Sequence, residues 1–183
     1  MEAGNRCFDE CLPEEINRRI VDIISDVNIC YSEHARRYLN ASNVAPQRTY
    51  VSGSPMAEVL HNNLAEIEAS DIHKRLGLEK GKYILLSAHR EENIDTEKNF
   101  NSLFNAINAM AEKYDMPILY SCHPRSRNRL VASGFKLDPR VIQHEPLGFH
   151  DYNCLQMNAF AVVSDSGTLP EESSFFTSVG HSF

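Results

Sequence analysis

A short polar segment near the carboxyl end of the chain has the residue types and spacing of a phosphate-binding turn. The segment reads Asp165-Ser-Gly-Thr-Leu-Pro-Glu-Glu172. An apolar, strand-like run leads into Ser166, Gly167 and Thr168, and a helix is predicted to follow. The free N–H groups and the positive dipole end of a helix start attract phosphate, and either Glu171 or Glu172 could reach ribose hydroxyls. An ordinary helix cap with nearby acidic residues explains the same residues, and the sequence alone favours the two interpretations about evenly.

Two further segments combine candidate proton carriers with cations. His89 and Arg90 directly follow a predicted strand. Pro13 begins a predicted helix in which Glu14 and Arg18 lie one turn apart on the same face, so a carboxylate and a guanidinium could project into one cleft. Each feature also has a purely structural explanation. A strand-terminal histidine can bond a backbone carbonyl, an arginine beside two carboxylates can form a solvated ion cluster, and proline before two acids is an ordinary helix start.

The elements that must position these side chains alternate between short β-rich runs and longer helical periods. The predicted strands are 27–31, 49–52, 83–88, 118–122, 141–144 and 161–164. The predicted helices are 14–25, 33–40, 56–76, 97–114, 125–132, 149–158 and 169–176. Continuously apolar strands separated by helices predict parallel sheets covered by helices, so the fold class is α/β and Rossmann-like. Ligands bind such sheets outside the carboxyl ends of the strands, where the polar segments fall.

The predicted elements form two groups separated by a polar stretch. Residues 61–80 are rich in Asn, Glu and Lys and are interpreted as a helical connector. Residues 1–60 are then the trailing part of one Rossmann-like domain, and residues 81–183 are a second, incomplete one. The sequence begins in a polar loop with no strand before it and stops where a further strand is expected to start. We therefore expect a truncated piece of a larger protein.

The composition argues against several classes of partner. The 183 residues carry a net charge of -7, whereas nucleic acids and anionic membrane surfaces attract basic patches. No apolar stretch approaches the ~20 residues that span a bilayer. The amino terminus has no apolar signal region, so we expect a cytoplasmic location. Cys7 and Cys11 make a poor zinc site without a second close pair, so we expect reduced thiols and no metal.

Five segments of the sequence form an ordered set. They are Glu2-Ala-Gly-Asn-Arg6, Pro13-Glu-Glu-Ile-Asn-Arg18, Gly53-Ser54, His89-Arg90-Glu91-Glu92-Asn93 and Asp165-Ser-Gly-Thr-Leu-Pro-Glu-Glu172. In their order and near spacing, they resemble the non-hydrolysing UDP-N-acetylglucosamine 2-epimerases over nearly the whole chain. The first and last segments look most like a sister branch that acts on UDP-2-acetamido-2,6-dideoxy-L-talose. That branch makes UDP-N-acetyl-L-fucosamine for bacterial surface polysaccharides.

The resemblance implies a glycosyltransferase-B type fold with two Rossmann-like domains, a homodimer, and chemistry without a nicotinamide or metal cofactor. The implied reaction removes the proton at C2 of a UDP-sugar while UDP leaves C1, and UDP returns after C2 is protonated on the opposite face. By position in the motifs, the catalytic candidates are Glu2 and Glu14 as acid and base, Arg18 as their support, and His89 at the sugar–diphosphate. The binding candidates are Arg90, then Ser166, Gly167 and Thr168 at the phosphates, and Glu172 at the ribose.

The sequence departs from the family pattern in several places. Thr168 stands where family members commonly have a second glycine, and Glu91 stands where they have a second arginine. A short loop between Arg6 and Pro13 favours the sister substrate. This sequence has no match to three features of the family: a glycine-rich phosphate loop, a further catalytic aspartate and an Arg-rich loop. We therefore expect this chain to lack full activity. Two alternatives are a glycosyltransferase of the same architecture, without a C2 base, and an inactive UDP-sugar-binding fragment.

Overall fold

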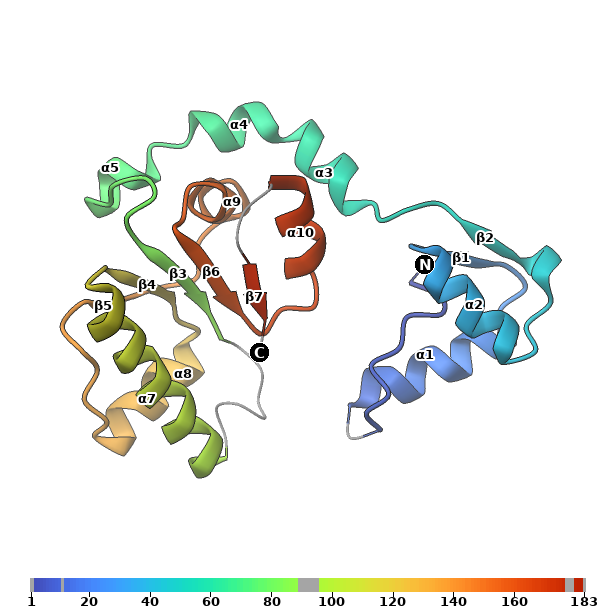
Figure 1. Ribbon diagram of the computed structural model, residues 1–183, viewed down its shortest axis with the longest axis horizontal. Helices are drawn as coiled ribbons and strands as arrows, with labels where there is room; N and C mark the ends of the chain where they lie inside the picture. Colours follow the sequence, from blue (N-terminus) through green and yellow to red (C-terminus); the bar gives the residue numbers. More distant parts are fainter. Residues whose placement is uncertain (1, 11, 89–95, 177–179, 183) are drawn as a thin grey trace. The chain divides into compact units, whose positions relative to one another are not determined.

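The computed structural model describes residues 2–10, 12–88, 96–176 and 180–182 (Figure 1). It divides into two compact units, Met1–Met56 and Ala57–Phe183. Each unit is built around a parallel sheet of its own. The described strands before residue 61 and those after residue 83 therefore belong to different sheets.

The described residues of the first unit form two helices, a 3-10 turn and two strands. They are α1 (Pro13–Ile24), β1 (Asn28–Cys30), α2 (Glu33–Ala41), η1 (Pro46–Arg48) and β2 (Thr49–Val51). The strands pair in parallel with Asn28 opposite Thr49, and α2 supplies the crossover that a parallel pair requires. The N–H of Ala3 donates to the carbonyl oxygen of Ile29 at 3.2 Å. The segment before α1 therefore lies beside β1.

The core of the first unit is small. Its buried members are Ala3, Cys30, Ala35 and Leu39. Helix α2 begins after Ser32, whose hydroxyl oxygen accepts a hydrogen bond from the N–H of Ala35 at 3.2 Å. Gly4 has φ +76°, and a Cβ at this position would lie 2.2 Å from the carbonyl oxygen of Ala35. Only glycine can therefore bring the amino-terminal segment this close to α2.

The described part of the second unit holds five parallel strands. Its first helices are α3 (Met56–Asn62), α4 (Leu64–Ala69) and α5 (Ile72–Leu76). They are followed by β3 (Ile84–Ser87), α7 (Glu97–Tyr114), β4 (Ile118–Ser121), α8 (Pro124–Ser133), β5 (Val141–His144), α9 (Phe149–Met157), β6 (Ala161–Ser164), α10 (Leu169–Phe176) and β7 (Gly180–Ser182). The strand order is β5-β4-β3-β6-β7, so β3 lies in the centre. The predicted parallel sheet is confirmed, and β7 lies where the sequence leads us to expect a further strand to start.

Helices cover both faces of this sheet (Figure 1). Ile84 and Leu86 of β3 face α7 and α8 and belong to the same apolar core as Phe104 of α7. Because side chains alternate along a strand, Tyr83 faces the other way. Its hydroxyl donates to the carbonyl oxygen of Leu155 in α9 at 2.5 Å. The sheet is therefore fastened to helices on each side.

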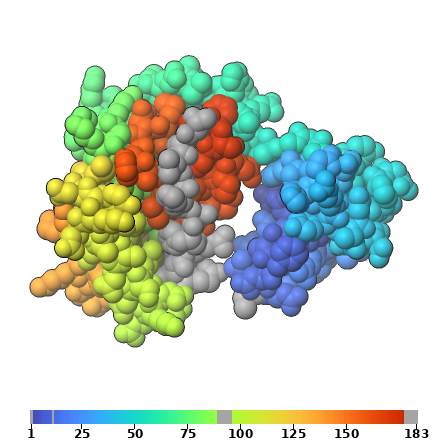
Figure 2. Space-filling view, viewed as in Figure 1, coloured from blue at the N-terminus to red at the C-terminus, as the bar shows by residue number. Residues whose placement is uncertain are grey.

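The predicted helix over 56–76 is wrong, because the structure breaks it into α3, α4 and α5. Ser70 donates through its hydroxyl to Asp151 Oδ1 at 2.6 Å and accepts from the N–H of Ile72 at 3.3 Å. Such side-chain bonds compete with the helical pattern of the backbone. Arg75 also donates to Asp151 Oδ2, at 2.6 Å. The break between α4 and α5 is thus held against α9, which both short helices contact. Figure 2 shows the residues of these two helices in green at the surface of the second unit.

The longest described helix is α7, with 18 residues. Its inner face buries Phe100, Phe104, Ile107 and Ala111. Glu97, at its first position, is exposed to solvent. None of the described helices is both long enough and apolar enough to cross a membrane.

Candidate functional site

The chain reverses direction across the sheet between β3 and β6. From β3 it proceeds to β4 and β5 on one side, and then returns to β6 and β7 on the other. Ser87 and Ser164 end the two strands as register partners, and both are buried. The N–H of Asp165 donates to the carbonyl oxygen of Ser87 at 3.2 Å. In open parallel sheets, ligands bind outside the carboxyl ends of the strands at this kind of switch point.

The turn over residues 166–168 leaves β6 at the switch point. Two of its hydroxyl groups bond one another, since Ser166 Oγ lies 2.9 Å from Thr168 Oγ1. The N–H of Ser166 donates to the hydroxyl oxygen of Ser164, at the end of β6, at 3.0 Å. The N–H of Thr168 donates to Ser166 Oγ, and the N–H of Leu169 donates to the Ser166 carbonyl oxygen, both at 3.4 Å. These two contacts are long for hydrogen bonds. These two N–H groups are therefore weakly bonded rather than unpaired. A stronger acceptor could replace the Ser166 oxygen atoms as their partner.

Gly167 lies exposed at the tip of this turn. A Cβ added there would meet nothing within 4 Å, and its φ lies outside the range that favours glycine. Neither backbone conformation nor packing therefore requires glycine at this position. The absent side chain leaves the backbone of the turn open to close approach by a ligand.

The Glu172 carboxylate is fixed at both oxygens beside the turn. Thr168 Oγ1 donates to Oε1 at 2.8 Å, and Gln156 Nε2 donates to Oε2 at 2.9 Å. Thr168 precedes the same helix α10, whereas Gln156 is a fully buried residue of α9. The structure thus brings together Ser166, Thr168 and Glu172, which the sequence singled out. Their placement at a ligand remains a prediction.

Sequence reasoning missed two residues of α9 at this site. Tyr152 lies one turn before Gln156, so their side chains share a face of the helix. Burial raises the pKa of Tyr152, whose hydroxyl also hydrogen-bonds Ser87. Tyr152 therefore presents a neutral hydroxyl at neutral pH. The available signal was the spacing of two polar side chains, four residues apart in a helix that must cover an apolar sheet.

In the first unit, the structure pairs Arg18 with Glu2 rather than with its helical neighbour Glu14. Arg18 Nη2 donates to Glu2 Oε2 at 3.0 Å, and both side chains are partly exposed. Glu14 is exposed in the first turn of α1. Glu2 has φ 62°, a left-handed conformation that is uncommon for a residue with a side chain. Such conformations are concentrated at functional sites.

The buried carboxylate of the Pro-Glu-Glu segment is Glu15, which sequence reasoning missed. It has no exposed surface. The N–H of Cys7 donates to Glu15 Oε2 at 2.9 Å, and Arg19 Nε donates to Oε1 at 2.8 Å. The hydrogen bond from the Cys7 backbone is the main cause that lowers the pKa of Glu15. Glu15 therefore fastens the loop before α1 and leaves Glu14 free to face outward.

A buried ion pair holds the segment that carries Glu2. Arg6 Nη2 lies 2.7 Å from Asp22 Oδ2, and both side chains are almost fully buried. The N–H of Gly4 also donates to the Asp22 carboxylate, at 3.2 and 3.3 Å to its two oxygens. The segment is thus tied to α1 at both Gly4 and Arg6. This arrangement fixes the backbone immediately after Glu2.

Two sequence-predicted residues, His89 and Arg90, lie outside the described residues. The described part of β3 ends at Ser87, two residues before His89. Within the ranges that the structure describes, no group of three or more His, Cys, Asp or Glu side chains could hold a metal ion.

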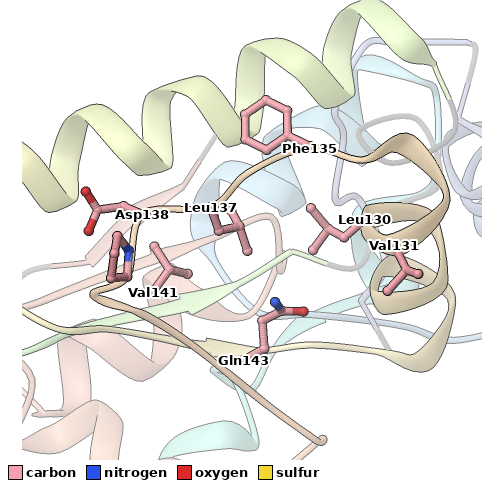
Figure 3. Close-up of a pocket in the computed structure, with 8 residues that line it drawn as sticks. Leu130, Val131, Phe135, Leu137, Asp138, Val141 and Gln143 are labelled. Carbon is pink, nitrogen blue, oxygen red and sulfur yellow. The ribbon is translucent and has the colours of Figure 1, made fainter.

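A separate hollow of about 360 Å³ lies beside the edge strand β5 (Figure 3). Leu130 and Val131 of α8 line it together with Val141 and Gln143 of β5. Asp138, at its rim, accepts two hydrogen bonds from the side chain of Arg140, which lower its pKa to about 2. A carboxylate held in this way stays ionised and is a poor proton donor. The hollow lies two strands away from β3 and is not the candidate site.

The family model described as UDP-N-acetylglucosamine 2-epimerase matches residues 1–179. The chain belongs to this family. It is 30% identical over 179 residues to a UDP-N-acetylglucosamine 2-epimerase of Methanocaldococcus jannaschii, covering 94% of this chain and 49% of that protein. It is also 30% identical over 177 residues to UDP-2,3-diacetamido-2,3-dideoxy-D-glucuronate 2-epimerase of Pseudomonas aeruginosa, covering 96% of this chain and 48% of that protein. The chain thus spans about half the length of these relatives.

Solved structures of 2-epimerases share the fold. A UDP-N-acetylglucosamine 2-epimerase from Rickettsia bellii has a TM-score of 0.88 and 42% identity, covering 98% of this chain and 48% of that one. The M. jannaschii UDP-GlcNAc 2-epimerase, in complex with UDP-GlcNAc and UDP, has a TM-score of 0.90 and 29% identity, covering 100% of this chain and 52% of that one. The expected family and the Rossmann-like, glycosyltransferase-B type fold class are therefore confirmed.

Proposed function

We propose that this sequence belongs to an enzyme that inverts C2 of a UDP-sugar by elimination and re-addition of UDP. The observation that carries the proposal is the switch point of the second unit, where the turn 166–168 meets a carboxylate fixed at both oxygens, Glu172. The turn would bind the diphosphate through its hydroxyl groups and loosely held amides. Glu172 would accept hydrogen bonds from the ribose. The similar M. jannaschii enzyme, solved with UDP-GlcNAc and UDP, supports a UDP-sugar as the ligand.

The proposed reaction has two balanced halves. In the first, a base removes the C2 proton, its electron pair forms the C1–C2 double bond, and the C1–O bond breaks so that UDP leaves with that bond pair. In the second, an acid protonates C2 on the opposite face, and a UDP oxygen forms a new bond to C1. The products of the first half are a 2-acetamidoglycal and UDP. The overall reaction needs two groups for proton transfer and a cationic or dipolar site for the leaving diphosphate.

Glu2 and Glu14 are the proposed groups for proton transfer. Arg18 Nη2 lies 3.0 Å from the Glu2 carboxylate and orients it. Glu14 is exposed and is not bound by the buried network around its neighbour Glu15. His89 and Arg90 are proposed at the sugar–diphosphate on their position in the sequence.

The proposed sugar is UDP-N-acetylglucosamine or, on the resemblance to the sister branch, UDP-2-acetamido-2,6-dideoxy-L-talose. The names of the relatives above specify UDP-N-acetylglucosamine and a diacetamido glucuronate. We also propose that the enzyme is a homodimer and that it acts in the cytoplasm. Its product would be a precursor of bacterial surface polysaccharides. A panel of these three nucleotide sugars would rank the substrates by kcat/KM.

Hydrogen exchange at C2 tests the proposed reaction directly. The 183-residue chain, and any longer product of the same reading frame, would be incubated with each nucleotide sugar in deuterated water. NMR should show deuterium entering at C2 and the C2 epimer accumulating. A glycosyltransferase would release UDP without C2 exchange, and a binding protein would do neither. The epimerase proposal would be contradicted if the 183-residue chain and the longer proteins bound UDP but showed neither hydrogen exchange at C2 nor accumulation of the C2 epimer.

A further inference from the structure

Gln156 of α9 is buried in a way that packing alone does not explain. The residue has no exposed surface. Its Nε2 donates to Glu172 Oε2 at 2.9 Å, and its Oε1 has no hydrogen-bond partner among the described residues. Burying an amide oxygen without a partner is unfavourable. A long apolar side chain would fill the same space without that cost, so the amide is explained by its bond to Glu172.

The two supports of Glu172 have different origins. Thr168 lies one turn before Glu172, and its contact at 2.8 Å moves together with α10. Gln156 reaches Glu172 from another helix, so it fixes the carboxylate relative to α9. With both oxygens bonded, the carboxylate loses most of its rotational freedom. A binding group held by partners outside its own helix is oriented before the ligand arrives.

The bonded carboxylate keeps acceptor capacity. Each carboxylate oxygen has two lone-pair sites, so the bonds from Thr168 and Gln156 leave one on each oxygen of Glu172. Two acceptor sites on adjacent oxygens match the two adjacent hydroxyl groups of a ribose. Neutral hydroxyl groups bonded to a carboxylate form stronger hydrogen bonds than they would to a neutral acceptor.

We propose that Gln156 is a positioning residue that orients the Glu172 carboxylate toward the 2′ and 3′ hydroxyl groups of a uridine diphosphate. The inference rests on the proposed function, because it takes the nucleotide at the switch point as its ligand. Gln156 itself does not touch the nucleotide. Its effect is therefore confined to the part of the binding free energy that depends on the ribose hydroxyls.

The test compares UDP with 2′,3′-dideoxyuridine 5′-diphosphate by calorimetry on the 183-residue chain. The unsubstituted protein should bind UDP about 10-fold or more tightly than the dideoxy analogue. Gln156→Met keeps the length and the helix propensity of the side chain but removes the donor. We expect it to weaken UDP binding about 10-fold and leave affinity for the analogue unchanged, so that the ratio approaches one. Gln156→Glu, which places a second carboxylate beside Glu172, should have the same effect.

The matched control is Asn153→Leu. Asn153 is another buried amide of α9, but its Nδ2 donates to the carbonyl oxygen of Phe149 in its own helix at 2.8 Å. This variant has a similar packing change and should keep the full ratio of the two affinities. All three variants would be checked for a native unfolding transition before titration.

The two affinities together separate the positioning role of Gln156 from the existence of the nucleotide site. If UDP binds the unsubstituted protein with the expected ratio and both Gln156 variants keep it, the positioning role is wrong while the proposed nucleotide site stands. If Gln156→Met weakens both ligands equally, Gln156 is only structural and the proposal is also wrong. If the unsubstituted protein binds UDP without any preference over the analogue, the ribose contact fails. If it binds no UDP at all, the proposed function and this inference are overturned together.

Discussion

Arg18 Nη2 and Glu2 Oε2 lie 3.0 Å apart and join the first turns of α1 to the amino-terminal segment beside β1. The sequence suggested that Arg18 would share a face with Glu14, and it does lie one turn away. The ion pair is made instead with a residue 16 positions earlier in the chain. Glu2 is thus constrained by its positive φ and by a guanidinium at once. The two proposed carboxylates therefore have different surroundings, one paired and one exposed.

Glu14→Gln should lower the rate of epimerisation by about two to four orders of magnitude, the usual contribution of a positioned acid or base. UDP affinity should barely change, because the group acts at C2 of the sugar. Deuterium incorporation at C2 measures the effect in any product of the reading frame that is active without the substitution. If Glu14 only favours the dipole of its helix, the variant would lose ~0.5–1 kcal/mol of stability and exchange would continue at the normal rate.

Glu15→Gln is the matched comparison, because the neighbouring carboxylate is buried. It should lower the free energy of unfolding by about 1.5–3 kcal/mol, the usual contribution of a hydrogen bond to a charged group. The lowered pKa of Glu15 predicts that its stabilisation is present above the unfolded pKa near 4.5 and is lost as pH falls through the folded value. Urea unfolding of both glutamine variants would be compared at pH 7 and pH 4. Equal loss of stability in the two variants would contradict the assignment of Glu15 as the structural member.

Arg6→Met should lower the free energy of unfolding of the first unit by about 3–5 kcal/mol, because it leaves Asp22 buried without its charge partner. The control is Arg36→Met, which removes an exposed pair with Glu33 and should cost less than ~1 kcal/mol. Amide hydrogen exchange resolves the first unit from the second. Similar protection of Ala3 in both variants would show that the buried pair does not hold this segment.

Glu172→Ala should weaken UDP binding by roughly 1–3 kcal/mol, the size of a lost charge-assisted hydrogen bond. Ser166→Ala should also weaken binding, because it removes a hydroxyl group from the turn and the contact with Thr168 at 2.9 Å. Calorimetry with UDP measures both. Unchanged affinity for UDP in the two variants would show that the nucleotide does not bind at this turn.

The second unit should become less stable as pH falls below about 6.5, the usual pKa of histidine. His73 is buried, and burial is the main cause that lowers its pKa. Because the folded pKa lies below the unfolded one, the unfolded chain binds the proton more readily, and stability is lost as pH falls through the folded value. His73 Nε2 lies 2.9 Å from the hydroxyl oxygen of Tyr83, which itself donates to Leu155, so the neutral ring must donate from Nε2.

His73→Gln checks this dependence, since an amide can keep the donor to Tyr83 but does not titrate. Urea midpoints between pH 5 and pH 8 should fall with acid in the unsubstituted protein and stay flatter in the variant. Parallel curves over this range would remove His73 as the cause.

The sheet of the second unit could be predicted because local signals and packing agree there. Runs such as Ile84–Ser87 are apolar on both faces, and only a strand covered on both sides buries such a run. The break near Ser70 could not be predicted, because the bond that favours it reaches Asp151, 81 residues away. The local pattern of 56–76 is helical throughout.

The candidate site was predicted in the same uneven way. Ser166, Thr168 and Glu172 lie within one short segment, so their proximity follows from the chain itself. Glu14 and Glu15 are adjacent and chemically identical, and what distinguishes them is the loop that brings the N–H of Cys7 to Glu15. Gln156 meets Glu172 only through the packing of α9 on α10. No sequence pattern within either helix carries that information.

The central position of β3 sets the order in which the second unit can assemble. Among the described elements, β4 can pair with β3 after α7 has formed, but β6 must find the other edge of β3 after α7, β4, α8, β5 and α9 have been added to the chain. Pairing between distant segments is slow, because the closure of a long loop precedes the contacts that stabilise it. The switch point does not exist until that late step. A refolding experiment should therefore find helices and the β3–β4 pair forming first, with any capacity to bind a nucleotide arriving in the slowest phase.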